Sequence, residues 1–233
     1  MIKVDQQEAP SDERLKGWIE SWAAGRKGFH REMPYEALVE FFPRFTEGLN
    51  LTATPRVLVP LCGKSVDLSW LASQGLQVCG AEGVPQAIQE LFGELGVEAQ
   101  REQLEKRSSY HHGALSIVDG DFLTLDADEV GCFDLCWDRA SMIALPEKLR
   151  SLYVERIISL VKPGGKVLLV TYEIERDPTI GPPYLVSEEE VQSRYAPFAK
   201  VECLRRVPWG EIGGARSAEA TFLITRHHTD SSP

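Results

Sequence analysis

Residues 56–75 read RVLVPLCGKSVDLSWLASQG, an apolar run followed by a short turn and a second segment that ends at a glycine. The run RVLVPL predicts a buried β-strand, and SVDLSWLASQG predicts a helix that Gly75 ends. The turn between them therefore lies at the carboxyl end of a strand. Open α/β sheets bind their ligands at that edge.

The turn contains Gly63-Lys64-Ser65, the three residues that also close the phosphate-binding loop of nucleoside triphosphatases. Such a loop needs a glycine five positions before Gly63, so that backbone amides can surround a phosphate. This chain has Leu58 there, inside the predicted strand. The sequence thus argues against an ATPase or kinase, and Lys64 and Ser65 are interpreted as the start of the following helix.

The alternation of strand and helix continues along the chain. Further strands are predicted at residues 76–82, 115–121, 133–138 and 166–174, helices at 84–95, 146–165 and 188–198, and an antiparallel pair at 201–208 and 219–226. This pattern predicts an α/β fold with a seven-stranded, mostly parallel, Rossmann-like sheet, helices on both faces and a terminal antiparallel hairpin. The charged residues 98–114 are expected to form a long loop.

The N-terminal part precedes the first predicted strand. Residues 1–10 are expected to be a flexible tail, and residues 11–233 a single domain in which 11–50 form a helical appendage. Trp18 and Trp22 share one stripe of its first helix, for which core packing is the alternative to a role in binding.

Composition excludes several classes of partner. With 25 Lys and Arg against 35 Asp and Glu, the net charge is −10, which disfavours nucleic acid. No apolar run is long enough to span a membrane, and the acidic, polar N-terminus does not resemble a signal peptide, so we expect a cytoplasmic protein without a membrane partner. The five cysteines are expected to be free thiols, and their spacing predicts no metal site.

Three predicted strand ends carry residues suited to a nucleoside. Glu82 follows the second strand, where its carboxylate can accept hydrogen bonds from two ribose hydroxyls; an ordinary surface charge is the alternative. Asp121 and Phe122 follow the third strand, where Asp121 can accept from an adenine amino group and Phe122 can cover the ring. An Asx turn is the alternative for Asp121. Together these features indicate one adenosine-containing ligand.

The glycine content of the turn reduces the number of possible ligands. A dinucleotide site uses G-x-G-x-x-G to seat a pyrophosphate, and this turn has one glycine. Adenosine without phosphates, on a sheet with a terminal antiparallel hairpin, points to S-adenosylmethionine.

Several segments resemble, in order and spacing, the thiopurine S-methyltransferase family, and in particular its bacterial members: RVLVPLCGKSVDLSWLASQG, CGAEG, GDF, WDRASMIALP and GPPYLV. SWAAGRKGFH is similar to the Trp-x₆-Phe-His opening of that family. The resemblance covers about residues 18–226 and implies a class I S-adenosylmethionine-dependent methyltransferase with an N-terminal helical lid.

The resemblance also implies roles for individual residues. Donor-binding positions are Trp22, Leu61, Gly63, Glu82, Asp121, Phe122 and Arg139. Phe29 falls where the N-terminal segment of the family covers the acceptor site. Arg139 falls beside the methyl sulfonium and near the acceptor, as the candidate catalytic residue, and an ion pair with Asp138 or Glu82 is its alternative. Arg216 matches loosely a second arginine that meets the substrate, and surface exposure is an equal alternative.

The expected activity is methylation of small thiols, aromatic or heterocyclic, by a monomeric enzyme that needs no covalent nucleophile. Two alternatives stay open. The acceptor could be inorganic sulfide, a halide, thiocyanate or a selenium or tellurium species, which would use the same donor site with a smaller pocket. Residues 31–41 and 98–114, which border the acceptor pocket, depart from the family pattern, so the donor is better defined than the acceptor. The chain could also be a non-catalytic S-adenosylmethionine-binding module.

Overall fold

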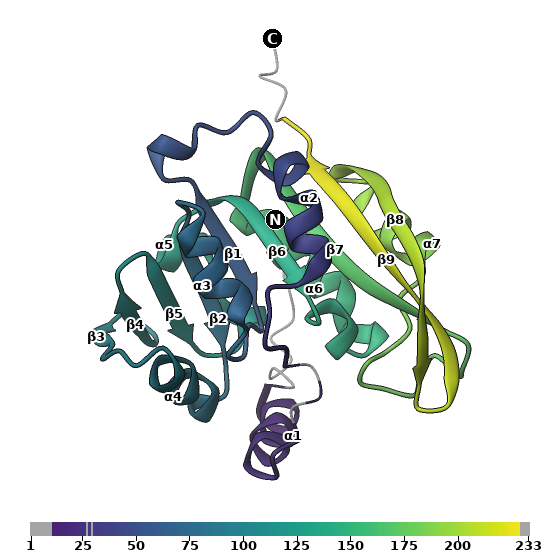
Figure 1. The fold of residues 1–233 in the computed structure, drawn as a ribbon, viewed down its shortest axis with the longest axis horizontal. Coiled ribbons are helices and arrows are strands. Elements are labelled where there is room, and N and C mark those ends of the chain that lie inside the picture. Colours follow the sequence, from purple (N-terminus) through teal and green to yellow (C-terminus); the bar gives the residue numbers. More distant parts are fainter. Residues whose placement is uncertain (1–10, 27, 29, 229–233) are drawn as a thin grey trace, which may run out of the picture.

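A single mixed β-sheet organises the protein. The computed structural model describes residues 11–26, 28 and 30–228. In the described part, nine strands pair in the order β3-β4-β5-β2-β1-β6-β7-β9-β8 (Figure 1). The strands are β1 (Arg56–Pro60), β2 (Gln77–Glu82), β3 (Gln100–Gln103), β4 (Ser108–His112), β5 (Leu115–Asp119), β6 (Phe133–Arg139), β7 (Val161–Ile174), β8 (Ala199–Ile212) and β9 (Ala215–Arg226). The predicted seven strands form the continuous part from β5 to β8.

The five central strands, β5, β2, β1, β6 and β7, run parallel, and β9 and β8 follow antiparallel. Their near-continuous apolar sequences suit a sheet that is covered on both sides. Along β1, Val57 and Val59 pack into one buried apolar cluster and Leu58 into another, as alternation along a strand requires. The α/β fold with its terminal antiparallel hairpin is therefore confirmed.

Helices cover both faces. The helices are α1 (Ser11–Ala23), α2 (Glu36–Thr46), α3 (Val66–Ser73), α4 (Pro85–Glu94), α5 (Ala127–Val130), α6 (Glu147–Leu160) and α7 (Glu188–Tyr195). Side chains of α2, α3 and α4 pack into one cluster, and those of α6 and α7 into the other. In Figure 1, α2 and α3 lie in front of the sheet and α6 behind it, while α1 lies beyond the carboxyl ends of β1 and β2.

The prediction of a loop at residues 98–114 was wrong. This segment forms β3 and β4, a hairpin that extends the sheet beyond β5, with Ser109 opposite Val118. The sequences QREQ and SSYHH carry no apolar alternation because all of β3 is exposed at the sheet edge. A polar edge strand of this kind resists pairing with other chains.

Two element boundaries also differ from the prediction. Helix α6 ends at Leu160 instead of at the Gly-Gly pair, because Val161 already pairs with Phe133 as the start of β7. Strands β8 and β9 are longer than predicted and meet at Gly213 and Gly214, whose φ angles are 60° and 80°. Two residues with positive φ are what a tight hairpin turn requires.

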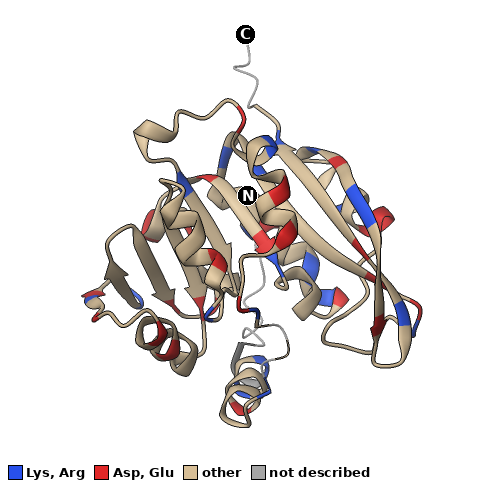
Figure 2. Ribbon diagram, viewed as in Figure 1, with Lys and Arg blue, Asp and Glu red and all other residues tan. Residues whose placement is uncertain are grey.

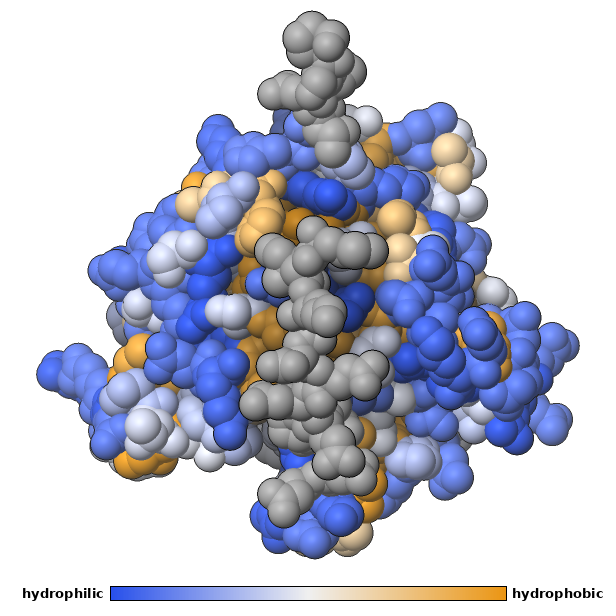
Figure 3. All heavy atoms as spheres, turned by 180° about the vertical axis from the view of Figure 1, so that it is seen from behind, coloured by the Kyte–Doolittle hydropathy of each residue, from blue (hydrophilic) through white to orange (hydrophobic). Residues whose placement is uncertain are grey.

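The outside of the molecule is largely polar. Figure 2 shows charges of both signs over the helices and strand ends, with few along the central strands. On the opposite face, Figure 3 shows hydrophilic side chains around the rim and apolar residues gathered nearer the middle. No helix in the described ranges is both long enough and apolar enough to cross a membrane.

Candidate active site

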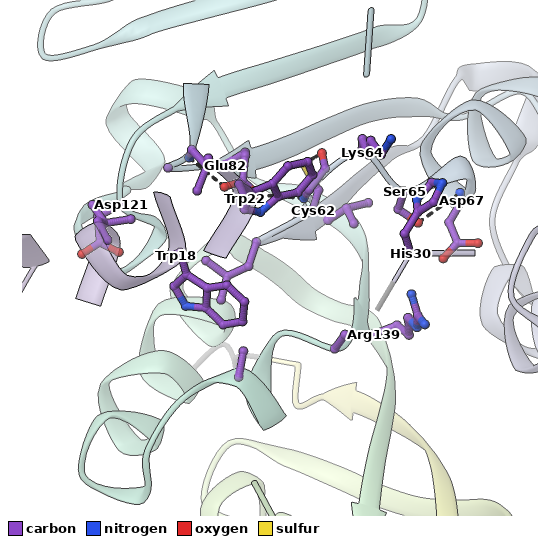
Figure 4. A pocket seen from close by; sticks show the side chains of 18 of the residues that line it. Trp18, Trp22, His30, Cys62, Lys64, Ser65, Asp67, Glu82, Asp121 and Arg139 are labelled. Carbon is purple, nitrogen blue, oxygen red and sulfur yellow. Dashed lines mark hydrogen bonds between the residues drawn. The ribbon is translucent and has the colours of Figure 1, made fainter. Parts of the chain in front are cut away.

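A cavity lies at the carboxyl ends of β1, β2 and β6, the edge at which open α/β sheets bind their ligands. We call it the first cavity. Its lining includes Arg14, Trp18, Trp22, Leu61, Gly63, Lys64, Glu82, Asp121 and Arg139. Figure 4 shows Asp121 at one end and Arg139 near the other, with Glu82 and Trp22 between them. Six of the seven predicted donor-binding residues therefore share one cavity.

Glu82, the last residue of β2, joins two elements of this cavity. Its Oε2 accepts a hydrogen bond from the Gly63 N–H at 2.7 Å, and its Oε1 accepts from the Val84 N–H at 2.8 Å. The side chain is buried, so it is not a surface charge. Burial raises the pKa of Glu82, and the backbone hydrogen bonds oppose that rise. A carboxylate has about four lone-pair positions, so Glu82 keeps capacity for ligand hydroxyls.

The turn after β1 is tight. Leu61 and Gly63 have φ angles of 44° and 52°, in the left-handed region that residues other than glycine adopt rarely. On the neighbouring strand, a Cβ added to Gly80 would lie 2.6 Å from the sulfur of Cys62, so the turn and β2 can approach this closely only with glycine there. The turn is thus held close to β2 at the edge of the sheet where the cavity lies.

Lys64 and Ser65 of this turn both make contacts with the helices that follow. Ser65 is the N-cap of α3, accepting a hydrogen bond from the Asp67 N–H at 3.2 Å. Lys64 Nζ lies 3.1 Å from Glu90 and forms a second ion pair with Glu94, both on α4. Two carboxylates therefore compensate the lysine that a phosphate-binding loop would direct to its ligand.

Asp121 belongs to the loop after β5 and contacts helix α1. Its Oδ1 lies 2.5 Å from Arg14 Nη2 and also accepts from the Leu123 N–H at 3.1 Å, as in the Asx turn that the sequence offered as an alternative. Neither contact uses Oδ2, which can therefore accept from a ligand.

The predicted role of Phe122 in covering the adenine ring is not supported. Its side chain has no exposed surface and packs against Tyr153, with ring centroids 5.3 Å apart. Phe122 is a core residue, because the short 3₁₀ turn Phe122–Thr124 directs it into the sheet-covering layer next to α6.

Arg139 ends β6 and lines both the first cavity and a second one. Its guanidinium lies over the ring of Tyr35, 4.5 Å from the centroid. Within the described residues it forms no ion pair, and its buried Nε has no hydrogen-bond partner. Asp138 instead accepts from Tyr153 Oη at 2.7 Å and from the Met142 N–H. The expected alternative, an ion pair with Asp138 or Glu82, is therefore not formed.

The second cavity adjoins the first. It shares Trp18, Arg31, Arg139, Ala140 and Ala144 with the first cavity. Beyond these, its walls include Ser21, Arg26, Gly28, Ile143, Tyr172, Pro182, Pro183, Trp209 and Ile212. Three aromatic side chains and three arginines line it, and its described lining contains no carboxylate. This composition suits a flat, anionic ligand.

Among the predicted substrate residues that the structure describes, Arg216 lines neither cavity. Arg216 is exposed on β9 and pairs with Glu175 at 2.9 Å, which agrees with the surface position that the sequence offered as an equal alternative. Phe29 lies outside the described residues. Trp22 is buried against Val84 and Ala87, as the core-packing alternative expects, and it also lines the first cavity, where its role in donor binding stays a prediction.

Sequence reasoning missed several cavity residues. Arg14, Arg31, Tyr172 and Trp209 were not considered, although GPPYLV and the final hairpin were recognised as part of the resemblance. The aromatic residue inside KVLLVTYEI, Tyr172, was the available signal, since a hydroxyl in an otherwise apolar strand needs a partner.

Comparison with known proteins decides the family. The family model described as thiopurine S-methyltransferase matches residues 13–213. The chain belongs to the thiopurine S-methyltransferase family. Thiopurine S-methyltransferases of Legionella pneumophila (strain Paris), Photobacterium profundum and Pseudomonas putida are 38%, 35% and 39% identical to it. The matches cover 81%, 89% and 90% of this chain and 83%, 96% and 95% of those proteins.

Solved structures show the same fold. The 1,6-didemethyltoxoflavin-N1-methyltransferase of Burkholderia thailandensis superposes with a TM-score of 0.60 over 96% of this chain and 93% of its own, at 16% identity. An S-adenosylmethionine-dependent methyltransferase of Methanosarcina mazei gives 0.62 over 84% and 100%, also at 16%. The predicted class I methyltransferase fold and the predicted family are confirmed, and the chain is an S-adenosylmethionine-dependent S-methyltransferase.

The first cavity fits the donor of this family. Glu82 and Asp121 each keep free carboxylate lone pairs, Asp121 at one end of the cavity and Glu82 nearer its middle, where hydroxyl and amino groups of adenosine can donate. Arg14 and Arg139 each contribute a buried Nε without a hydrogen-bond partner in the described residues. Lys64 is compensated, as a ligand without phosphates requires.

Proposed function

We propose that the chain methylates the sulfur of a small aromatic or heterocyclic thiol that binds in the second cavity. The observation that carries this proposal is the junction of the two cavities at Arg139 and Ala140, next to aromatic walls supplied by Trp18, Tyr172 and Trp209. Ring stacking against these side chains favours a planar acceptor. The names of the family's curated members support the same substrate class.

The proposed roles follow from position. Trp22, Leu61, Gly63, Glu82 and Asp121 bind the donor, with Glu82 on the ribose and Asp121 on the adenine. S-adenosylmethionine supplies a methyl group that its positively charged sulfur already activates for displacement. The protein then contributes orientation, which for well-aligned reactants is worth about 7–11 kcal/mol.

Arg139 acts as the catalytic residue at the junction. Its guanidinium attracts a thiolate or an acidic substituent of the acceptor, and the ring of Tyr35 beneath it holds it in place. Arg31 and Arg26 add positive charge to the same cavity. We therefore expect aromatic thiols that carry a carboxylate to be preferred over neutral ones of the same size.

We also propose the arrangement around this site. Residues 11–233 form one domain, in which the helical region 11–50 covers the site as a lid: Leu15 of α1 lies against Gly83 and Arg14 against Asp121. The net charge of −10 supports an enzyme without nucleic-acid partners that works as a cytoplasmic monomer.

Two measurements test the function. Calorimetry with S-adenosylmethionine and S-adenosylhomocysteine should show binding of both, and absence of binding at sub-millimolar ligand would exclude the donor site. Mass spectrometry of products from a panel of mercaptobenzoates, neutral thiophenols, thiocyanate, sulfide and selenite then identifies the acceptor. Methylated mercaptobenzoate as the main product supports the proposal, and methylation confined to the inorganic acceptors overturns it.

A further inference from the structure

Three buried side chains form a hydrogen-bonded series that begins at the wall of the second cavity. Tyr172, which lines that cavity, has its hydroxyl oxygen 3.0 Å from that of Tyr35. The Tyr35 hydroxyl also forms a hydrogen bond with Glu219 Oε2, and Glu219 Oε1 lies 3.1 Å from Arg205 Nη2. All three are at most 8% exposed. The series joins β7, the start of α2 and β9.

Counting protons fixes the direction of these hydrogen bonds. Glu219 forms an ion pair with Arg205, and a carboxylate in an ion pair can only accept hydrogen bonds. Burial raises the pKa of Tyr35 and of Tyr172, so both hydroxyls are protonated at neutral pH. Tyr35 therefore donates its one proton to Glu219, and its oxygen accepts the proton of Tyr172.

This direction determines what Tyr172 offers to the second cavity. Its proton is committed to Tyr35, so its oxygen has only a lone pair left. A ligand that meets this oxygen must bring a hydrogen-bond donor, which for a thiol acceptor is the S–H group, or the ring N–H of its thione tautomer.

We propose that Tyr172, Tyr35 and Glu219 form a proton relay that removes the proton a neutral acceptor must lose on methylation. The inference rests on the proposed function. The S–H or N–H bond of the acceptor breaks as the S–CH₃ bond forms, and the electron pair left on sulfur makes the new bond. Its proton passes to Tyr172, that of Tyr172 to Tyr35 and that of Tyr35 to Glu219, so both tyrosines end neutral and Glu219 ends protonated.

The far end of the relay adjoins a groove, whose lining includes Arg31, Tyr35, Glu36, Arg205 and Glu219. The Glu219 side chain itself has no exposed surface, whereas Arg205, its ion-pair partner, is 17% exposed. Release of the proton from Glu219 therefore requires a local opening toward this groove. Among the described residues, the charged groups that face Tyr172 are Arg31 and Arg139. At the other end of the relay, Arg205 pairs with Glu219 and also lies 2.5 Å from Glu40 of α2. The positive charges near Tyr172 favour departure of a proton toward Glu219.

A purely structural role predicts something different. If the three groups only filled space and fixed Arg139, their removal would affect every acceptor alike. A relay matters only for acceptors that arrive protonated, because an acceptor that is already a thiolate has no proton to lose. The pKa of the acceptor therefore separates the two explanations.

The kinetic test uses Tyr172→Phe, Tyr35→Phe and Glu219→Gln in the full chain. The control is Tyr110→Phe on β4, which lies between β3 and β5. The two acceptors are 4-nitrothiophenol, a thiolate at neutral pH, and benzyl thiol, which is protonated there. For benzyl thiol we expect kcat of the three relay variants to fall roughly 10²-fold, the lower end of general acid–base effects. For 4-nitrothiophenol we expect a change of less than about threefold, because no proton transfer is needed.

A binding measurement gives a readout that does not depend on turnover. With S-adenosylhomocysteine present, Tyr172→Phe should weaken binding of benzyl thiol about fivefold, as for loss of one neutral hydrogen bond. Binding of its S-methyl product should stay unchanged, since the product has no proton to donate. Both titrations use calorimetry and the same protein preparations, after thermal melting has verified that each variant is folded.

Each outcome has one meaning. Equal losses for both acceptors, or benzyl thiol turnover unchanged in Tyr172→Phe and Glu219→Gln, would overturn the relay while leaving the methyltransferase function in place. If the wild type methylates neither thiol, the proposed acceptor class fails instead. Should one variant fail to fold, the other two and the binding pair still decide the question.

Discussion

The guanidinium of Arg14 lies 2.5 Å from Oδ1 of Asp121, so a single ion pair joins helix α1 to the loop that follows β5. Both side chains are about one-tenth exposed, at 12% and 8%. The two residues are 107 positions apart, and their contact closes one end of the first cavity. The N-terminal helix is thereby held over the site by a bond that one substitution can remove.

Arg14→Gln should loosen this helix. We expect faster hydrogen exchange in residues 14–23 and donor dissociation about tenfold faster, which corresponds to roughly 1.4 kcal/mol. Exchange mass spectrometry and stopped-flow displacement measure the two effects. Lys16→Gln, an exposed change on the same helix, is the control, and identical behaviour of the two variants would contradict the closing role of Arg14.

Glu82→Gln should weaken binding of the donor by about 1–3 kcal/mol, because one carboxylate oxygen becomes an amide that cannot accept. The amide also faces the N–H of Gly63 or Val84, so part of the loss comes from the turn itself. Calorimetry with S-adenosylmethionine measures the affinity, and the exposed Glu98→Gln serves as the control. An affinity equal to that of the wild type would reject the ribose-binding role.

Arg139→Gln should lower kcat/KM by about 10²-fold or more, since the charge at the cavity junction is lost. The loss should be larger for a mercaptobenzoate than for a neutral thiophenol, because only the former carries an additional anion. Folding should change little, as Arg139 forms no ion pair within the described part of the chain. Steady-state kinetics and melting curves, with Lys148→Gln as an exposed control, separate the effects. Unchanged turnover would remove Arg139 from the mechanism.

Asp138 should make stability depend on pH. Burial raises the pKa of its carboxyl to about 6, although Tyr153, Met142 and Ser141 donate hydrogen bonds to it. A raised folded-state pKa stabilises the protein below the unfolded value, and this contribution is lost as the pH rises through about 6.

The variant Asp138→Asn isolates that effect. Relative to it, the wild type should lose roughly 2–3 kcal/mol of unfolding free energy between about pH 4 and pH 7.5. Urea unfolding at several pH values measures the difference. A constant difference between the two proteins across this range would show that Asp138 does not titrate as inferred.

Arg216→Ala should leave activity intact. The guanidinium is 81% exposed and pairs with Glu175 on the surface, away from both cavities. We expect kcat/KM to change by less than about twofold, as for ordinary surface substitutions. A large rise in KM for the acceptor would mean that the terminal hairpin moves onto the site when the acceptor binds.

The sequence predicted those parts of the protein in which a local pattern has one physical meaning. Apolar strands between glycine-ended helices specify a covered parallel sheet, and Glu82 at a strand end specifies a ligand edge. The hairpin formed by β3 and β4 was not predicted because both strands are polar in sequence and β3 is exposed along its whole length, so periodicity carries no information there.

The acceptor side was harder to predict because its residues come from distant segments. Arg31, Tyr172 and Trp209 meet only through the antiparallel pairing of β7, β9 and β8 and the segment before α2. Phe122 shows the opposite difficulty. Its position next to Asp121 was identified from the sequence, but a sequence does not show to which side of a turn a ring points. The ring of Phe122 points into the core, against Tyr153.

Lys64 has a consequence for how the protein discriminates among adenosine compounds. Nucleoside triphosphates share the adenine and ribose that Glu82 and Asp121 are proposed to recognise, so these contacts alone cannot reject them. Glu90 and Glu94 neutralise the one cation of the Gly-Lys-Ser turn, and buried Glu82 adds negative charge beside it. A polyphosphate placed at this turn would meet carboxylates instead of a free ammonium group. We therefore expect Glu82, Glu90 and Glu94, which surround the turn, to reject competing nucleotides at residues 58–65, the segment that most resembles a nucleotide-binding loop.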